Sequence, residues 1–185
     1  DELKTLRKLL ETRTDLVFAC HLPMREIPAF HWLFDAIPAG KLGGVYAIDG
    51  EYLWGRLHKI TEGWRGNESD YSPVMGGAIH LVDLMLLCLP PYSVCNVSAT
   101  SNAISLAGTG LSMPSYVAAT YRFDNGVIGR IKINMGAQLP HQHRFVVYGT
   151  LGTFVFQEGY ANFLRRRPNS PPAAEYVLQD LGVWR

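Results

Sequence analysis

The chain has 185 residues, of which 48% are hydrophobic and 18% charged, a composition typical of one globular domain with a sizeable core. Its formal net charge of +1 excludes the basic surface of a nucleic-acid-binding domain or of a protein held electrostatically on a membrane. Since no apolar run is long enough to span a bilayer and no signal peptide is visible, we expect a cytoplasmic protein.

The first residues predict an amphipathic helix over residues 1–14. Its acidic side chains come first and its basic ones after, an order that complements a helix dipole. The sequence has no initiating methionine, so we expect this helix to belong to a longer protein. The leucines at helical spacing are Leu3, Leu6, Leu9 and Leu10.

Three elements and a loop follow. Residues 15–22 predict a short buried strand, and residues 28–39 predict a helix that ends at Gly40. Residues 43–56 alternate as a long strand, and residues 55–73 form a polar loop of the kind that often carries function. The more aromatic side of the strand, which we expect to be packed or to face a substrate, carries Tyr46, Ile48, Gly50, Tyr52 and Trp54.

The next segment, Met75–Pro90, predicts a buried helix that contains two titratable side chains, His80 and Asp83. Their i, i+3 spacing places them on the same side of the helix, so one cleft could use both, or the carboxylate could hold the imidazole in place. The glycines at 76 and 77 let another backbone or a ligand come close to the helix start. The alternative is a hydrogen-bonded histidine that serves only the core.

The C-terminal half is rich in Val, Ile, Tyr and Thr. It predicts strands over residues 93–105, 115–123, 127–135 and 144–156, and Asp124-Asn-Gly126 predicts a type I′ hairpin turn. The fold class is therefore α+β, with an open, mostly antiparallel β-sheet and helices on one face. Alternate strand positions are partly apolar on both sides, so we expect the second face to be covered as well, through a homo-oligomer.

Two histidines, His141 and His143, share one side of a predicted strand, a spacing that permits a metal site. No acidic or cysteine partner stands nearby in the sequence. We therefore expect no metal there and a polar start to the strand after Pro140.

Several short motifs, in this order along the chain, resemble those of the Gfo/Idh/MocA family of nicotinamide-dependent sugar oxidoreductases, and together they cover roughly residues 1–156. The motifs are Arg25-Glu-Ile-Pro28, Ile37-Pro-Ala-Gly40-Lys-Leu-Gly43, Gly76-Gly-Ala-Ile-His80-Leu-Val-Asp83, Phe123-Asp-Asn-Gly126-Val-Ile-Gly129 and Gly149-Thr-Leu-Gly152.

The resemblance implies a division of the chain. Residues 1–14 would be a helix left over from a missing nucleotide-binding half, residues 15–164 an α+β substrate and oligomerisation domain, and residues 165–185 an Arg- and Pro-rich tail segment. His80 and Asp83 would be the catalytic residues. The implied substrate contacts, also chosen because aromatic platforms and multidentate donors suit hydroxylated ligands, are Arg25, Tyr52, Trp54, Arg56 and Trp64.

The chain also departs from the family pattern. The acid that usually stands four residues before the histidine is Gly76 here, and the Glu-Lys-Pro motif that supplies a catalytic lysine is absent. No Gly-x-Gly-x-x-Gly follows a strand; the nearest sequence, Gly108-Thr-Gly110, lacks the third glycine.

The resemblance therefore implies the substrate domain of an NAD(P)-dependent dehydrogenase that acts on a sugar, polyol or related hydroxy compound. NAD or NADP would bind in the full-length protein, and this fragment alone would bind neither and be inactive. The alternatives are a catalytically silent binding or scaffold module of the same fold and a sheet-mediated interaction domain. The partners that we expect are a small-molecule substrate and further copies of the chain, with no nucleic acid and no membrane.

Overall fold

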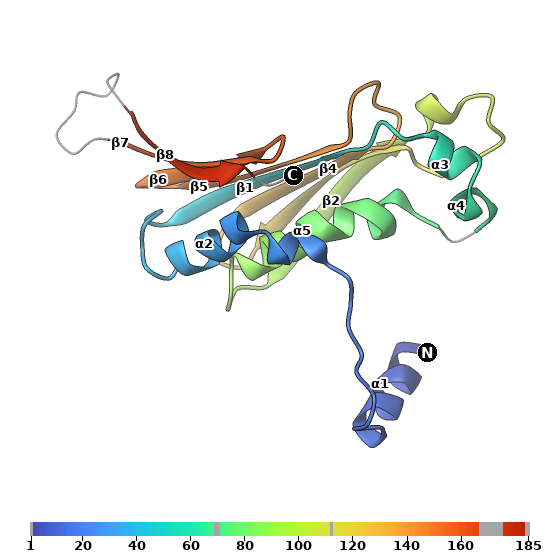
Figure 1. Cartoon of the computed structure of the whole chain (residues 1–185), viewed down its shortest axis with the longest axis horizontal. Helices are drawn as coiled ribbons and strands as arrows, with labels where there is room; N and C mark the ends of the chain where they lie inside the picture. The colour runs from blue at the N-terminus through green and yellow to red at the C-terminus, as the bar shows by residue number, and fades with distance from the viewer. Residues whose placement is uncertain (1, 69–70, 112, 167–175, 184–185) are drawn as a thin grey trace.

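A computed structural model describes residues 2–68, 71–111, 113–166 and 176–183. Its centre is an eight-stranded sheet in the order β2-β3-β4-β1-β5-β6-β7-β8 (Figure 1). Of the neighbouring pairs, β1 and β4 run parallel and all others are antiparallel. The strands are β1 (Val45–Leu53), β2 (Val94–Asn102), β3 (Tyr116–Phe123), β4 (Ile128–Asn134), β5 (Gln142–Gly149), β6 (Gly152–Gln157), β7 (Tyr160–Arg166) and β8 (Tyr176–Val183).

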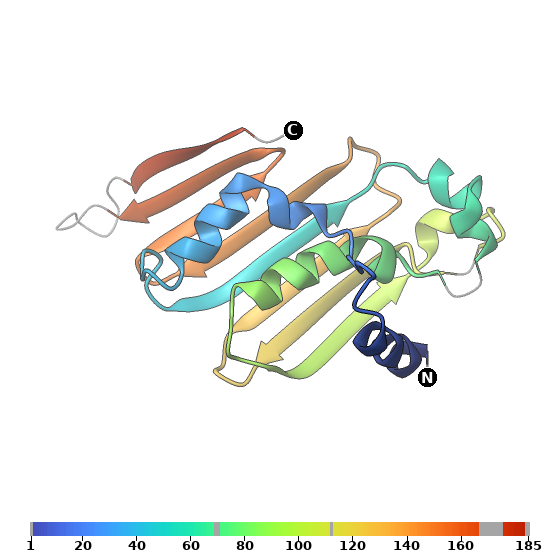
Figure 2. The ribbon, with the colours of Figure 1, turned by 60° about the horizontal axis from the view of Figure 1, so that its bottom comes forward.

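The helices that pack on the sheet lie on one face, which Figure 2 shows from below. They are the 3-10 turn η1 (Pro23–Glu26), helix α2 (Pro28–Ala36), the π-turn η2 (Val74–Ala78) and helix α5 (Ile79–Leu87). The core lies between them and the sheet, where Phe30 of α2 meets Phe145, Phe154 and Phe156 with ring centroids 5.0–5.8 Å apart. This arrangement confirms the predicted α+β class, with an open, mostly antiparallel sheet and helices on one face.

Strand β1 buries the side that its alternation predicted. Tyr52 and Trp54 are 8% and 7% exposed, and Ile48 is fully enclosed. Tyr46 is the exception at 55% exposed, because a register shift between Val45 and Ala47 interrupts the pairing of β1 with β5 there. The aromatic side chains at the carboxyl end of β1 therefore face the helices.

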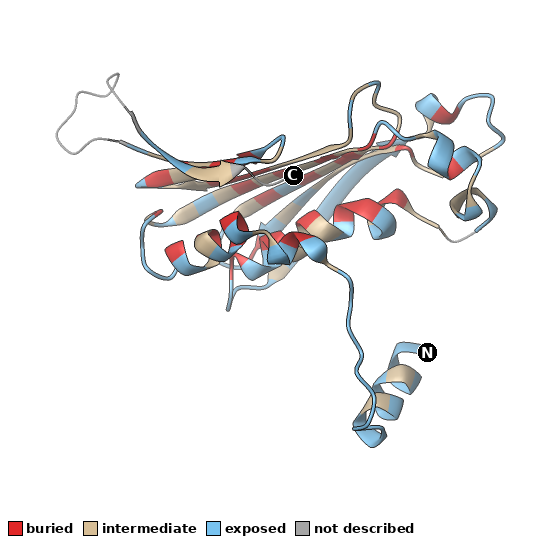
Figure 3. Cartoon of the chain, in the orientation of Figure 1, coloured by how far each residue is buried: buried red, intermediate tan, exposed pale blue. Residues whose placement is uncertain are grey.

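The chain start differs from the prediction. Helix α1 (Glu2–Thr12) forms, but it lies away from the sheet, with Leu3 and Leu9 exposed (Figures 1 and 3). Residues 15–22 form no strand, and Val17 is 96% exposed. An apolar run becomes a strand only beside a partner backbone, and no described strand pairs with this segment.

The chain end also differs. Arg165 lies within β7, and residues Tyr176–Val183 form β8, which pairs with β7 from Arg166 to Tyr160 at the sheet edge. The segment predicted as a tail therefore contributes strand pairing, although residues 167–175 lie outside the described part. An edge strand needs a single neighbour for its backbone hydrogen bonds, so a short segment with a weak pattern can still join a sheet.

Two turns refine the strand predictions. The hairpin between β3 and β4 forms, but Glu158 is the one non-glycine residue with positive φ in the described chain, so Asn125 cannot take part in a type I′ turn. Gly126, at φ +88, is instead the last residue of a β-turn in which its N–H donates to the Phe123 carbonyl, so the hairpin loop is one residue longer than a type I′ loop. The predicted strand 144–156 is two strands, β5 and β6, joined at residues 149–152.

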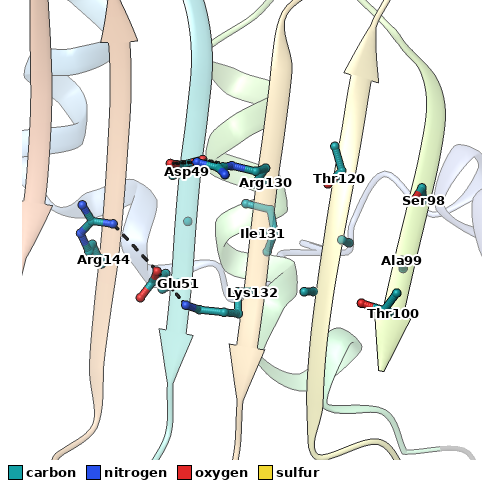
Figure 4. Close-up of a pocket in the computed structure, with 13 residues that line it drawn as sticks. Asp49, Glu51, Ser98, Ala99, Thr100, Thr120, Arg130, Ile131, Lys132 and Arg144 are labelled. Atoms are coloured by element: carbon teal, nitrogen blue, oxygen red, sulfur yellow. Dashed lines mark hydrogen bonds and ion pairs between the residues drawn. The ribbon is translucent and has the colours of Figure 1, made fainter. Parts of the chain in front are cut away.

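The outer face of the sheet is more polar than its sequence pattern predicted. Arg130 pairs with Asp49 at 2.6 Å, and Lys132 with Glu51 at 2.9 Å. Figure 4 shows these side chains around a shallow hollow of about 440 Å³, with Thr120, Ser98 and Thr100 along its other side. No helix in the described residues is long and apolar enough to cross a membrane.

Candidate functional site

Three histidines surround Tyr52 at the carboxyl end of β1. The ring of Tyr52 lies 4.7 Å from His143, 5.2 Å from His141 and 6.4 Å from His80 between centroids, and it is stacked with His80. His141 and His143 approach the strand from its β5 side, where Tyr52 and His143 are paired in register. His80 comes from α5. We call these four residues the histidine cluster.

The close approach of α5 to Tyr52 depends on a glycine. A Cβ added at Gly77 would stand 3.0 Å from the Tyr52 ring and 2.8 Å from Ile133. Gly77 therefore lets the start of α5 lie directly on β1, and this contact brings His80 to the ring.

The environment of the cluster keeps its histidines neutral at pH 7. Burial lowers the pKa of His80, with a smaller effect of His21 in the same direction and an opposing one of Asp83. Burial and then Arg56 lower the pKa of His141. For His143, burial followed by the neighbouring His141 and His80 lowers the pKa to about 4. Neutral imidazoles can accept a proton from a reacting hydroxyl.

Two ring nitrogens of the cluster have no partner. The Nδ1 atoms of His80 and His141 are buried without a hydrogen bond, and they are the only such side-chain atoms among the described residues. Unpaired buried polar atoms cost free energy and are rare in folded proteins. Both of them belong to the histidine cluster.

Asp83 does not contact His80 directly. Its carboxylate accepts two hydrogen bonds from the guanidinium of Arg25 on η1, one of them 2.6 Å long from Nε, and this pairing raises the pKa of Arg25. The side chain of Asp83 is 13% exposed and that of Arg25 45%. Arg25, predicted as a substrate contact, thus joins η1 to α5.

The side chain of Tyr71 fills the space beside Gly76, the position where the family pattern has an acid. A Cβ at Gly76 would stand 2.2 Å from the hydroxyl oxygen of Tyr71, so the phenol fills the space that a longer side chain would need. The sequence offers three other carboxylates that could take the place of this acid: Asp49, Glu51 and Asp70. Asp49 and Glu51 are held on the outer face by Arg130 and Lys132, and Asp70 lies outside the described residues.

A cation sits among three aromatic rings beside the cluster. The guanidinium carbon of Arg65 lies 4.6 Å from the ring centroid of Trp64, 5.8 Å from that of Trp54 and 5.9 Å from that of Tyr71. Arg65 belongs to the short helix α4 (Trp64–Asn67), which follows α3 (His58–Thr61) in the loop after β1. The sequence prediction named Trp54 and Trp64 but missed Arg65, although its place beside Trp64 in a functional loop was a usable signal.

The remaining predicted contact, Arg56, is exposed at the end of β1, where its backbone N–H donates to the Trp54 carbonyl. Burial raises the pKa of Tyr52, and the positive charges of Arg56 and Arg65 partly offset this by lowering it. Of the predicted substrate contacts, Tyr52 belongs to the histidine cluster, Arg56 acts on it electrostatically, and Trp54 and Trp64 pack on Arg65 beside it. Arg25 alone of the predicted substrate contacts is engaged elsewhere.

A cavity of about 760 Å³ opens beside His141 and His143. Its lining also includes Glu158 and Tyr160, at the turn between β6 and β7. Glu158 has a positive φ of 53°, a strained conformation for a residue with a side chain. The sequence did not single out Glu158, because a turn residue of this type carries no local signal.

No group of three or more His, Cys, Asp or Glu side chains in the described ranges could hold a metal ion. The described chain also offers no nucleotide-phosphate loop, since Gly108 and Gly110 lie in the stretch between η3 (Ile104–Leu106) and strand β3, with no helix after them.

The sequence matches the model of one protein family. Residues 30–155 match the GFO/IDH/MocA C-terminal domain. No curated protein matches the sequence at the significance required.

Solved structures share the fold at low sequence identity. A protein from Thermotoga maritima, provisionally assigned as an oxidoreductase, matches with a TM-score of 0.75 and 14% identity over 99% of this chain and 54% of its own. Levoglucosan dehydrogenase, in complex with NADH and levoglucosan, matches with a TM-score of 0.70 and 22% identity over 89% of this chain and 46% of its own. A protein from Desulfitobacterium hafniense, provisionally assigned as an NADPH-dependent oxidoreductase, matches with a TM-score of 0.75 and 16% identity over 96% of this chain and 52% of its own. The chain thus spans about half the length of these structures.

Proposed function

The chain belongs to the GFO/IDH/MocA family through that family's C-terminal domain, and from this premise we propose that it is the substrate-binding and oligomerisation domain of an NAD(P)-dependent oxidoreductase. The proposed substrate is a sugar, a polyol or a related hydroxy compound. Levoglucosan dehydrogenase, whose structure contains NADH and levoglucosan, supports the nicotinamide cofactor and the hydroxylated substrate in this proposal.

The observation that carries the proposal is the place of His80. Its imidazole is half-buried and stacked on Tyr52, and its neighbours are histidines, a tyrosine and an aspartate rather than leucines alone. Burial keeps the ring neutral, so His80 would accept the proton of a substrate hydroxyl during oxidation and return it during reduction. Tyr52 and Trp54 would supply the apolar surface on which the substrate ring or carbon chain rests.

The cofactor belongs to the complete protein in this proposal. A nicotinamide supplies hydride transfer when bound, and NAD or NADP would be held by residues outside the described part. The described residues would bind and orient the substrate and exchange its proton. Titration of this fragment with NADH or NADPH should therefore give no saturable fluorescence change at micromolar concentrations.

The test of the proposed function is His80→Ala in the complete natural protein. Loss of a general acid–base group should lower turnover about a hundred- to ten-thousand-fold while nicotinamide affinity stays nearly unchanged. His31→Ala, which removes an exposed histidine of α2, is the matched control. A His80→Ala protein that melts several degrees lower but turns over normally would instead identify a core histidine.

A catalytically silent binding module is the second candidate, because Gly76 and Tyr71 occupy the place of the family acid. Such a module would bind the hydroxylated ligand without nicotinamide-dependent turnover. Substrate binding by calorimetry together with an absent NAD(P)H signal at 340 nm, in a protein that binds the cofactor, would favour it over the enzyme.

A further inference from the structure

Three basic side chains lie at the end of the histidine cluster nearest α3 and α4. Arg56, Lys59 and Arg65 take part in none of the ion pairs formed by the described residues. The charges of Arg56 and Arg65 lower the pKa of Tyr52, and those of Arg56 and Lys59 lower the pKa of His141. These cations therefore act on the same site as His80.

Two carboxylates, Glu62 and Glu68, stand at the ends of α3 and α4, but among the described residues neither forms an ion pair with Arg56, Lys59 or Arg65. No carboxylate of the described residues contributes to the pKa of Tyr52, His141 or His143. Asp83 reaches His80, but its charge is already neutralised by two hydrogen bonds from Arg25. Glu158 also lines the neighbouring cavity, but it is not among the groups that shift the pKa of these histidines. At position 76, a tyrosine hydroxyl fills the space where a carboxylate could have stood.

The setting of Arg65 is suited to an anion. Trp54, Trp64 and Tyr71 lie within 5.9 Å of its guanidinium carbon. Aromatic contacts of this kind hold the guanidinium by its faces and leave its in-plane N–H groups available. An arginine fixed in this way can donate two parallel hydrogen bonds to a carboxylate or a phosphate without first ordering its side chain.

We propose that the substrate of this site carries an anionic group as well as hydroxyls, and that Arg65, assisted by Arg56, binds that group while the hydroxylated part lies over Tyr52 toward His80. The inference rests on the proposed function and deepens it by naming the substrate class. A carboxylate and a phosphate share the required chemistry, so a sugar acid and a sugar phosphate are the two sources to distinguish.

The experiment compares three probes with the same six-carbon chain: D-glucitol, D-gluconate and D-glucitol 6-phosphate. Binding to the complete natural protein is measured by titration calorimetry at low salt and without nicotinamide. We expect at least one anion to bind at least about tenfold more tightly than glucitol, and the advantage to shrink in added NaCl. The preferred anion identifies the carboxylate or the phosphate as the source. Equal affinity for all three probes, or saturable binding of neither anion, would overturn the proposal.

Variants locate the effect. Arg65→Gln should weaken binding of the preferred anion about 10- to 100-fold and leave glucitol unchanged, while Arg65→Lys should restore part of the loss. Arg122→Gln, which removes an exposed charge of β3, is the control and should have no effect. If Arg65→Gln fails to fold, Arg56→Gln and the salt dependence of the wild-type protein decide the question. Unchanged anion affinity in a folded Arg65→Gln protein would contradict the assignment.

The two proposals can fail separately. Anion preference that persists in a protein without nicotinamide-dependent turnover would retain the anion site and reject the dehydrogenase. Turnover that depends on His80 but not on anionic groups would do the reverse.

Discussion

At the scale of single residues, the site depends on one side chain filling the space of another. Gly76 can be explained by Tyr71, whose hydroxyl stands 2.2 Å from the position of an added Cβ. The Tyr71 ring is itself held edge-on by Trp64, 5.9 Å away, and by Arg65. Replacement of Gly76 is therefore coupled to the aromatic rings around Arg65.

We expect Gly76→Asp to displace Tyr71 and to destabilise the protein by about 1 kcal/mol, without a gain in activity, because overpacking forces neighbours to move. The double variant Gly76→Asp with Tyr71→Ala should recover much of this stability, since the space is then open. Urea denaturation measures both, and Gly44→Ala, where the nearest atom is 3.9 Å away, is the control. Higher turnover in Gly76→Asp alone would show that Tyr71 yields easily and that the acid had been limiting.

His143 should make stability depend on pH. Burial lowers its folded pKa from 6.5 to about 4, so between these values the unfolded chain binds a proton that the folded chain does not. Stability should therefore fall as the pH drops from 6.5 toward 4, by up to about 1.4 kcal/mol per pH unit from this residue.

The check is the free energy of unfolding in urea at pH 7, 6 and 5. His143→Gln should flatten the decline, while His58→Gln, which removes an exposed histidine of α3, should keep the wild-type slope. Equal slopes in wild type and His143→Gln would contradict the buried, neutral state of this histidine. His80 and His141, whose pKa values are also lowered, should leave a residual slope.

At the scale of elements, an ion pair fixes η1 against α5. Arg25 and Asp83 are 58 positions apart, and two hydrogen bonds join their side chains. Because α5 also carries His80, this pair helps to set the position of His80 relative to η1 and to His21, which precedes η1. Its members differ in exposure, which decides what each substitution should do.

Arg25→Gln should lower the melting temperature more than Asp83→Asn. The first leaves a largely buried carboxylate without its partner, whereas the second leaves a guanidinium that water can reach. The double variant should be less destabilised than the sum of the two, because the pair is lost once. Thermal unfolding of the four proteins measures this cycle, and strict additivity would mean that the pair contributes nothing.

At the scale of the whole molecule, one sheet face is packed by helices and the other is open. The open face carries a hollow, and the charges of β1, β4 and β5 around it are paired to one another (Figure 4). Desolvation of a paired charge costs less free energy than desolvation of a single one, so such a face can still meet a second copy of itself.

We expect light scattering to show a dimer or a larger species. Thr120→Trp, which places a large side chain in the hollow, should shift the protein toward monomer, since two sheets could no longer approach closely. Glu26→Trp, an exposed substitution on the helix face, should not. A wild-type protein that is monomeric at both micromolar and high concentration would rule out the shared-sheet arrangement.

The sequence by itself determined the local structure of this protein. Alternation in β1, the Asp124–Gly126 turn and the apolar helix around His80 are set by neighbours within a few residues, and they predicted the α+β class and singled out His80. The same local patterns failed at residues 15–22 and 176–183, because a strand also needs a partner backbone that no local pattern specifies.

The composition of the site was decided only by the tertiary structure. His141 and His143 lie against Tyr52 because β5 pairs with β1. Tyr71 contacts Gly76 because the loop after β1 passes beside the start of α5. Arg25 binds Asp83, 58 positions away in the sequence. Such contacts depend on how the sheet and helices pack as a whole, and no spacing in the sequence encodes them. Residue types could therefore predict a histidine in a cleft, whereas the packed fold decided which charges surround it.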